Sequence, residues 1–337
     1  MTIQSAAIAQ SNTPGHLRKM GLGEFERFIE LIETAFAEDQ AREGRSFRDE
    51  IRSLDKLLPL FKVMFAVAPP LEDYFCTYVW EVDGHFASAV TVRRQGSDAL
   101  RWYIANVATH PDCRGRGLAR TLVSAALDRI RARGGRYAFL DVRADNEPAY
   151  RLYRSLGFLQ LETSTTFKGD THPMALPALP GDYALRPLAA MEWRTRLTVA
   201  QYLASPETRS VCPPTAKQFQ PGWIGRSLQA LIDRAQHIQE QTGAIAAYTQ
   251  PIGLVTCRAQ RSGRNPHQVQ IALAPEHVIT AAAAIAQAIN YCVGQRSGAA
   301  HPMLIKLAGL SSAVAEQLRV NGFTPIETVH ELGMKVS

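Results

Sequence analysis

The chain has 337 residues, a length typical of two domains. Apolar residues make up 46% and charged residues 20%, proportions that are ordinary for a folded protein and exclude a largely disordered one. The net charge of +6, from 37 basic and 31 acidic residues, does not by itself indicate a partner made of nucleic acid.

No apolar run approaches the ~18 residues of a membrane span. The N-terminus also lacks the basic start and apolar core of a signal peptide, so we expect no membrane partner and a cytoplasmic location. The cysteines are odd in number and form no CxxC pair. This pattern argues against a disulfide framework and against a cysteine-built zinc site, and we expect no metal.

The first half of the chain predicts alternating helices and strands. Apolar residues recur at three- and four-residue spacing over 22–36, which predicts an amphipathic helix, and a less regular helical pattern covers 46–65. Two β-rich runs flank Asp83-Gly84 and predict a hairpin. Further along the chain, the expected elements are a strand over 101–109, a helix over 117–133, a strand over 137–144, a short helix over 146–158 and a last strand over 159–168.

A proline-containing stretch over 170–182 has no clear periodicity and is typical of a linker. Beyond it the order of elements repeats weakly. The pair Pro14-Gly15 recurs as Pro180-Gly181, and the Gly157-Phe158 turn recurs as Gly322-Phe323. The expected elements of this half are strand-like runs over 244–259, 268–275, 303–309 and 328–336, with helices over 278–292 and 311–323. This matching order predicts the duplication of one domain.

The informative motif is the turn between the strand over 101–109 and the helix that follows it. Its sequence, VATHPDCRGRGLA, carries Arg114, Gly115, Arg116 and Gly117. Glycines let successive backbone amides converge, and a helix N-terminus favours an anion. Residues 101–160 also hold 11 arginines against 5 acidic residues. The turn therefore predicts a phosphate or pyrophosphate site, although a basic turn that only caps the helix is the structural alternative.

Two motifs together closely resemble the GNAT superfamily of acetyl-CoA-dependent N-acetyltransferases. The first is R-x-x-G-x-A, at Arg114, Gly117 and Ala119. The second, about 30 residues later, is N-x-x-A-x-x-L-Y-x-x-x-G-F, which runs from Asn146 to Phe158. The resemblance covers about residues 15–168. A Walker loop is excluded, because no Gly-Lys-Ser/Thr follows the glycines. A Rossmann fingerprint is a poor match, because G-x-G-x-x-G is not present.

The resemblance implies an α/β (α+β) fold of two GNAT-like domains, each with a mixed, mostly antiparallel central sheet flanked by helices. It implies a GNAT domain over 1–169 that binds acetyl-CoA and is catalytic, a linker over 170–182 and a degenerate GNAT-like domain over 183–337. In the family, two neighbouring parallel strands part, and the pantetheine arm of the cofactor lies between them. The residues implied to bind acetyl-CoA are Val107, Ala108, Thr109, Arg114, Gly115, Arg116, Gly117, Leu118, Ala119 and Asn146. Asn146 also suits a helix N-cap, and it can fill both roles.

Tyr153 matches the general acid of the family, which assists the departing CoA thiolate. A tyrosine near pKa ~10 and a thiol near ~8.5 differ by ~1.5 units, so full proton transfer costs ~2 kcal/mol. A hydrogen bond to the thiolate is enough to be useful, and complete transfer is not required. Tyr150, three residues earlier, is the second candidate. The backbone N–H of Val107 is the expected donor to the thioester oxygen.

The general base departs from the family pattern, because Ala105 stands where many members place a glutamate. An amine of pKa ~10.4 is only about 0.04% neutral at pH 7, a deficit of ~4.6 kcal/mol. The open alternatives are a relayed water, His110, Glu81 or Asp141, an acceptor of low pKa, or no base at all. For each named side chain, surface charge or ion pairing is the competing interpretation.

The second half lacks the residues of both motifs. With Pro275 aligned to Pro111, residues 278–283 carry no arginine and no glycine, and Leu318 and Ser311 replace Tyr153 and Asn146. We therefore expect no second acetyltransferase site there. This half can wall the substrate cleft, stabilise the first domain or bind something else.

The leading hypothesis is an N-acetyltransferase that acts on a small amine or an amino terminus by direct attack. The alternative is a non-catalytic acyl-CoA sensor or interaction protein. A nucleic-acid partner is not expected, because the basic residues cluster at the predicted phosphate loop and form no stripe with aromatic residues. The acceptor, the length of the acyl group and the oligomeric state are left open.

Overall fold

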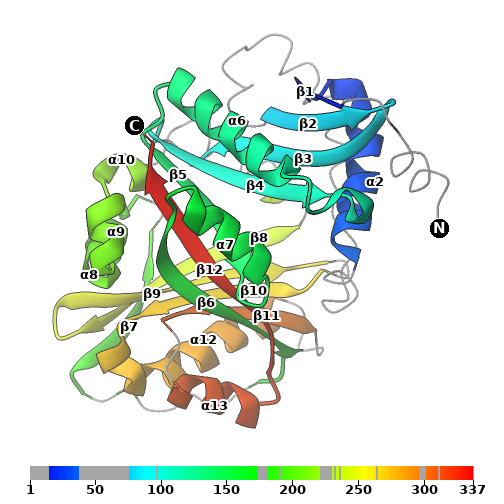
Figure 1. Cartoon of the computed structure of the whole chain (residues 1–337). Coiled ribbons are helices and arrows are strands. Elements are labelled where there is room, and N and C mark those ends of the chain that lie inside the picture. Colours follow the sequence, from blue (N-terminus) through cyan, green and yellow to red (C-terminus); the bar gives the residue numbers. More distant parts are fainter. Residues whose placement is uncertain are drawn as a thin grey trace. The chain divides into compact units, whose positions relative to one another are not determined.

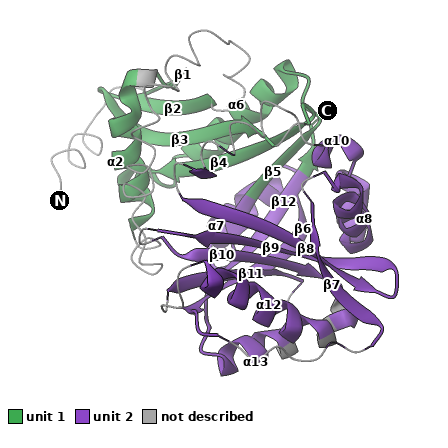
Figure 2. Cartoon of the chain, turned by 180° about the vertical axis from the view of Figure 1, so that it is seen from behind, with its two compact units in different colours: residues 1–140, 334–337 green, residues 141–333 purple. Residues whose placement is uncertain are grey.

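The computed structural model describes residues 15–37, 76–95, 98–173, 179, 181–189, 191–220, 230, 233–234, 237–262, 265–295, 301–309 and 312–336. The predicted helix over 46–65 and part of the predicted linker lie outside these residues. The described chain forms two compact units (Figure 2). Unit 1 contains residues 1–140 and 334–337, and unit 2 contains residues 141–333. Neither boundary coincides with the predicted linker over 170–182.

Unit 1 is built on a mixed sheet with the strand order β1-β2-β3-β4-β5 (Figure 1). The strands are β1 (His16–Lys19), β2 (Cys76–Val82), β3 (His85–Arg94), β4 (Arg101–Thr109) and β5 (Tyr137–Arg143). All neighbours run antiparallel except β4 and β5, which are parallel. The hairpin around Asp83-Gly84 is confirmed. The strand β1 was not expected, because HLRK is too short and too polar to show a periodic signal.

Two helices pack on the sheet of unit 1. The helix α2 (Phe25–Ala35) follows a single 3-10 turn, η1 (Leu22–Glu24), and buries Phe28, Leu31 and Ile32 against β2, β3 and β4. The helix α6 (Leu118–Ala132) contacts the same three strands. Its buried residues Leu122, Ala126 and Ile130 recur every four residues, which is the spacing of one helix face.

The strand order in unit 2 is β12-β6-β11-β10-β9-β8-β7. The bounds are β6 (Leu159–Asp170), β7 (Tyr183–Leu188), β8 (Ile238–Ala247), β9 (Gln250–Gln260), β10 (His267–Leu273), β11 (Pro302–Ala308) and β12 (Thr324–Lys335). The predicted strand-like run over 244–259 is divided by a tight turn at Tyr248, whose φ is +55°. The run therefore covers the end of β8 and most of β9.

The helices of unit 2 belong to both halves of the chain. They are α7 (Glu147–Ser155), α8 (Trp193–Leu203), α9 (Pro206–Val211), α10 (Ala216–Phe219), α12 (Ala281–Gly294) and α13 (Ser312–Val320). The alanine-rich α12 is buried along most of its length, and this lets it lie close to β9 and β10. The helices α8, α9 and α10 were not predicted from the sequence.

The last strand of each half pairs outside its own half. Within unit 2, β6 lies between β11 and β12, and it runs antiparallel to both. Phe167 of β6 is fully buried in a core built otherwise from residues of the second half, including Met303 and Phe323. At the other end of β12, residues 334–337 belong to unit 1, where the Val336 N–H donates to the Arg136 carbonyl over 2.8 Å. The two copies have therefore exchanged their terminal strands.

Candidate active site

A bulge in β4 sets the geometry at the centre of unit 1. Ala89 pairs with Ala108 and Thr91 pairs with Ala105, so β4 has one more residue than β3 in this interval. Asn106 lies in the extra position with φ of +51°, a left-handed conformation that asparagine tolerates better than most residues. The ladder between β4 and β5 covers only Arg101 to Tyr103. Beyond Tyr103, the backbone of β4 is thus available to a ligand on the side of β5.

The predicted phosphate loop follows directly after β4. It passes through a 3-10 turn, η4 (Pro111–Cys113), and reaches α6 through two exposed glycines. Gly115 and Gly117 both have φ of +77°, and a Cβ atom on either one would meet nothing within 4 Å. Gly117 is the N-cap of α6, and no side chain caps the helix there. The first N–H groups of α6 therefore face open space, which is the arrangement that binds anions.

The two arginines of the loop have different surroundings. The Arg114 guanidinium donates to the Ala35 carbonyl over 3.0 Å, and its backbone N–H donates to Pro111 over 3.2 Å. A cation at the end of α2 is favourable for that helix. Arg116 is exposed and makes no hydrogen bond or ion pair with any residue that the structure describes. The guanidinium group of Arg116 is therefore available to an anion at this loop.

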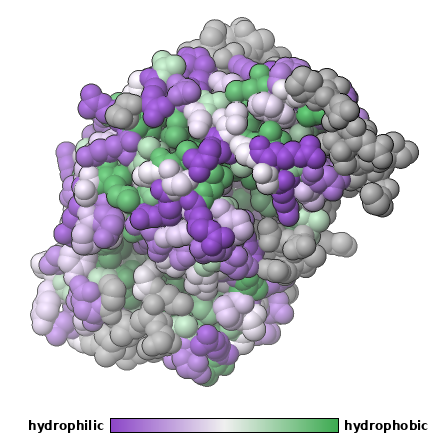
Figure 3. All heavy atoms as spheres, in the orientation of Figure 1, coloured by the Kyte–Doolittle hydropathy of each residue, from purple (hydrophilic) through white to green (hydrophobic). Residues whose placement is uncertain are grey.

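The second motif forms α7, in unit 2. The Asn146 side chain accepts the Ala149 N–H over 3.2 Å, so its N-cap role is confirmed. Tyr153 is 5% exposed and lies edge-on to Phe158, with ring centroids 6.1 Å apart. Burial raises the pKa of Tyr153 above its ordinary value. Tyr153 is therefore a neutral hydroxyl that can donate a hydrogen bond but holds its proton tightly. Figure 3 shows hydrophilic side chains over α6 and α7.

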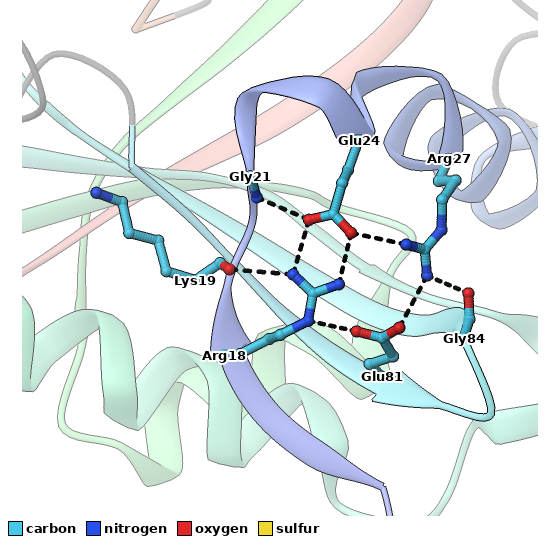
Figure 4. Close-up of polar contacts among 7 residues, drawn as sticks. All are labelled: Arg18, Lys19, Gly21, Glu24, Arg27, Glu81 and Gly84. Carbon is cyan, nitrogen blue, oxygen red and sulfur yellow. Dashed lines mark hydrogen bonds and ion pairs between the residues drawn. The ribbon is translucent and has the colours of Figure 1, made fainter. Parts of the chain in front are cut away.

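Two candidates for the general base are already engaged. The carboxylate of Glu81 binds the guanidinium groups of Arg18 and Arg27, and these contacts lower its pKa (Figure 4). His110 is buried, which lowers its pKa, and its Nδ1 accepts the Asp112 N–H over 3.4 Å. Both groups are poor proton acceptors for an amine. Asp141 is exposed on β5.

Glu24 completes the ion cluster of Figure 4, which joins β1, η1, α2 and the β2–β3 hairpin. It accepts two hydrogen bonds from Arg18, at 2.6 and 2.7 Å, and one from Arg27 at 2.7 Å. The hydrogen bonds from Arg18, together with the Gly21 N–H, lower the pKa of Glu24 to about 2. The stabilisation from this carboxylate is therefore complete above its ordinary pKa of about 4.5, and it is lost as the pH falls towards 2.

We expect Glu24→Gln to lower the free energy of unfolding at pH 6. The loss should be much smaller at pH 2.5, because the carboxylate is protonated in the unfolded chain at that pH, and most of its stabilisation of the folded state is already gone. Urea unfolding at the two pH values measures this difference. The matched control is Glu316→Gln, in an exposed pair with Arg319 on α13. An equal loss at both pH values would contradict the ionic role of Glu24.

The turn of the second half that aligns with the phosphate loop holds a chain of polar side chains. His277, in η5 (Pro275–Thr280), lies between the Tyr183 and Tyr202 hydroxyls, which are 3.1 Å and 3.4 Å from its Nδ1 and Nε2. Tyr202 also donates to Glu276 over 2.7 Å. This turn is thus occupied by the protein's own side chains, and no glycine lies in η5 or the first turn of α12.

Comparison with known proteins identifies the segment that contains both motifs. Residues 35–158 match the model of the family described as acetyltransferase (GNAT) family. The segment is therefore similar to the GNAT family of acetyltransferases. It includes the bulged β4, the glycine loop, α7 and the turn that follows α7 as far as Phe158.

Curated relatives match over short stretches. A mycothiol acetyltransferase from Saccharomonospora viridis is 41% identical over 61 residues, which is 18% of this chain and 20% of that protein. N-alpha-acetyltransferase 30 from Schizosaccharomyces pombe is 42% identical over 59 residues, 18% of this chain and 39% of that protein. The chain thus matches between about a fifth and two fifths of the length of these relatives.

Solved structures match over nearly the whole chain. A GCN5-related N-acetyltransferase from Sphaerobacter thermophilus has a TM-score of 0.57 at 14% identity, with 96% of each chain covered. A tandem GNAT protein from the clavulanic acid biosynthesis pathway has a TM-score of 0.51 at 13% identity, with 96% of this chain and 99% of that chain covered. The predicted fold class, two GNAT-like domains with a mixed sheet and flanking helices, is confirmed. No helix among the described residues is long and apolar enough to cross a membrane.

Three features of this region were not found from the sequence. The bulge at Asn106 has no signal beyond the residue type, and the contact between Arg114 and Ala35 joins segments 79 residues apart. The third is Glu162 on β6. Its carboxylate lines an open hollow in unit 2, and the alternating pattern of a strand does not show such a position.

Proposed function

We propose that the protein is an N-acetyltransferase that moves the acetyl group of acetyl-CoA to a primary amine by direct attack. The observation that carries this proposal is the loop before α6. There, two left-handed glycines and an uncapped helix start lie beside Arg116, whose guanidinium is available. The named acetyltransferases that match short stretches of the chain support the same reaction class.

The cofactor assignments follow the loop and the bulge. The amides of residues 115–119 bind the pyrophosphate, with Arg116 adding charge, while Arg114 positions the loop through its bond to α2. Val107, Ala108 and Thr109 offer backbone groups to the pantetheine arm where β4 has left its ladder with β5. Asn146 caps α7 and binds the same arm. Tetrahedral charge on the thioester oxygen is stabilised by the Val107 N–H.

The two domains are proposed to have different roles. Residues 1–169 carry the acetyl-CoA site, 170–182 form the linker, and 183–337 form a GNAT-like copy without a second cofactor site. The turn closed by Tyr183, His277 and Tyr202 supports the last assignment. One acetyl-CoA per chain is the expected stoichiometry.

Tyr153 is proposed to donate a hydrogen bond to the CoA thiolate as it leaves. We expect Tyr153→Phe to lower kcat by about 10- to 150-fold, because a hydrogen bond to a charged group contributes about 1.5–3 kcal/mol. The dissociation constant of acetyl-CoA is expected to stay the same. Thiol release with a panel of primary amines measures kcat, and calorimetry measures binding.

Tyr150→Phe is the matched comparison, because it removes a hydroxyl from the same helix that is hydrogen-bonded to Gln160. A larger loss in this variant than in Tyr153→Phe would transfer the acid role to Tyr150. Acetyl-CoA binding with no thiol release from any amine would support an acyl-CoA sensor in place of an enzyme.

A further inference from the structure

An open hollow of about 470 Å³ lies in unit 2 between α7, β6 and α9. Its wall is polar on most sides. The lining residues are Tyr150, Arg154, Leu159, Gln160, Leu161, Glu162, Thr163 and Glu207. Tyr150 and Arg154 belong to the same helix as Tyr153.

A hydrogen-bonded chain fixes one wall of the hollow. The Tyr150 hydroxyl donates to Gln160 Oε1 over 3.0 Å, and Gln160 Nε2 donates to Thr163 Oγ1 over 3.0 Å. Thr163 Oγ1 is also 2.9 Å from Nδ1 of His330, whose ring lies edge-on to Tyr150. Arg154 donates to the Phe158 carbonyl over 3.0 Å. These groups satisfy one another, so the wall is ordered before any ligand arrives.

The two carboxylates that line the hollow differ from the hydrogen-bonded side chains of its wall. Within the part of the chain that the structure describes, the side-chain carboxylates of Glu162 and Glu207 make no hydrogen bond and no ion pair. Glu162 lies on β6 directly opposite Glu331 of β12. Glu162 is exposed to solvent in this open hollow, and partial desolvation still raises its pKa. Lys306 partly offsets this effect, and Asp141 adds to it. A carboxylate in such surroundings gains from a bound cation and accepts a proton more readily than an ordinary one.

We propose that this hollow binds the acceptor as a cationic primary amine, with Glu162 holding the ammonium group and taking its proton. This inference rests on the proposed acetyltransferase function. Glu207, which α9 contributes to the lining of the hollow, binds a second positive charge of the acceptor or remains solvated when the acceptor has only one.

The reaction balances with the groups named. The ammonium R–NH₃⁺ gives one proton to the Glu162 carboxylate, and the free lone pair attacks the thioester carbonyl. The C–S bond then breaks, and the thiolate leaves with a hydrogen bond from Tyr153. The amide nitrogen loses its second proton to the thiolate, and protonated Glu162 releases its proton to water. The products are the N-acetylated amine, CoA thiol and one proton.

The test compares Glu162→Gln with the control Glu316→Gln, in steady-state assays with acetyl-CoA and three acceptors. The acceptors are 1,4-diaminobutane, benzylamine and an arylamine that is neutral at pH 7. With the two alkylamines at pH 7, kcat/KM is expected to fall by at least about 100-fold in Glu162→Gln, the lower end of general-base effects. The control is expected to match the unsubstituted protein, and acetyl-CoA binding is expected to be unchanged in both variants.

The fall in kcat/KM caused by Glu162→Gln must depend on the protonation of the acceptor. In Glu162→Gln it should shrink as the pH approaches 10, where alkylamines lose their proton unaided, and it should be small for the arylamine at every pH. Other titratable or charged groups face Glu162 from α7, α9, β5, β11 and β12. They are Tyr150, Arg154, Glu207, Asp141, Lys306, His330 and Glu331. Because these groups are present in both proteins, the difference between the two pH profiles reports Glu162 alone.

Several outcomes overturn the inference. An equal loss with all three acceptors, or no loss with the alkylamines, excludes Glu162 as the proton acceptor while the acetyltransferase proposal stands. If the unsubstituted protein acetylates none of the three, calorimetry with 1,4-diaminobutane decides: binding that is lost in Glu162→Gln supports the hollow, and no binding overturns it. Absence of acetyl-CoA binding refutes the proposed function separately, since it does not depend on Glu162.

Discussion

A chain cut at residue 169 is expected to yield no folded protein from either part. The first part would keep β6 except for its last residue, Asp170, but lose both of its neighbours, because β11 and β12 lie beyond the cut. The strand would then expose both of its edges, and Phe167, fully buried in the intact protein, would lose its core. Burial of one such side chain contributes about 1.5–3 kcal/mol, and each lost ladder bond costs about 1 kcal/mol more. The sum exceeds the stability of an ordinary domain.

The second part would be damaged for the same reason. Without β6, one edge of β11 and one edge of β12 have no partner strand in unit 2, and exposed edges of this kind promote aggregation. Circular dichroism and thermal unfolding of residues 1–169 and 170–337, made separately, measure the outcome. Co-expression of the two parts is the control, and we expect it to restore a soluble complex. Cooperative unfolding of residues 1–169 alone would show that the exchange of strands is not required for folding.

Gly117→Asp is expected to weaken acetyl-CoA binding by at least about 100-fold. The substitution places a carboxylate where the uncapped start of α6 and the left-handed glycines offer N–H groups to a phosphate. The new side chain caps the helix and repels the anion, so it removes two contributions at once. Titration of acetyl-CoA by calorimetry measures both the loss and the number of sites, which we expect to be one per chain.

Gly134→Asp is a matched control at the other end of the same helix. Gly134 has φ of +72° and equally open space around its missing Cβ, so the backbone cost of the substitution is similar. It lies beyond the C-terminus of α6, where no anion is expected. Equal weakening by the two substitutions would mean that helix stability explains the effect and that the loop is not the phosphate site. Two sites per chain would contradict the proposal for the second half.

The strands and helices of the first half follow closely from local sequence. β4 has the predicted bounds, and β2 and β3 are the two strands predicted on either side of the Asp83-Gly84 turn. β-branched and aromatic residues and this turn leave few alternatives. The helix expected over 22–36 begins three residues later as an α-helix, since the 3-10 turn η1 precedes it. Element type was therefore well determined wherever the pattern was periodic.

The features that could not be predicted from the sequence depend on contacts between residues far apart in the chain. The pattern of β6 predicts a strand but not its partners, because β11 and β12 follow more than 130 residues later. Glu81 is a glutamate and could by its residue type be a catalytic base. Only the positions of Arg18 and Arg27 show that its carboxylate is held in ion pairs. The motif residues, in contrast, were identified because glycine and arginine at fixed spacing have a local physical reason. Tyr153 as the acid and the residues bound to the cofactor stay predictions.

The order of synthesis gives the exchanged strands a further consequence. During translation, β6 leaves the ribosome about 130 residues before β11, its earlier partner in the chain. At about 5–20 residues per second, this delay is on the order of 7–26 seconds. For that time β6 presents two open edges, and the first copy cannot close until β12 (Thr324–Lys335) has also been made. Nascent chains of this protein are thus expected to occupy a chaperone until β12 has been synthesised.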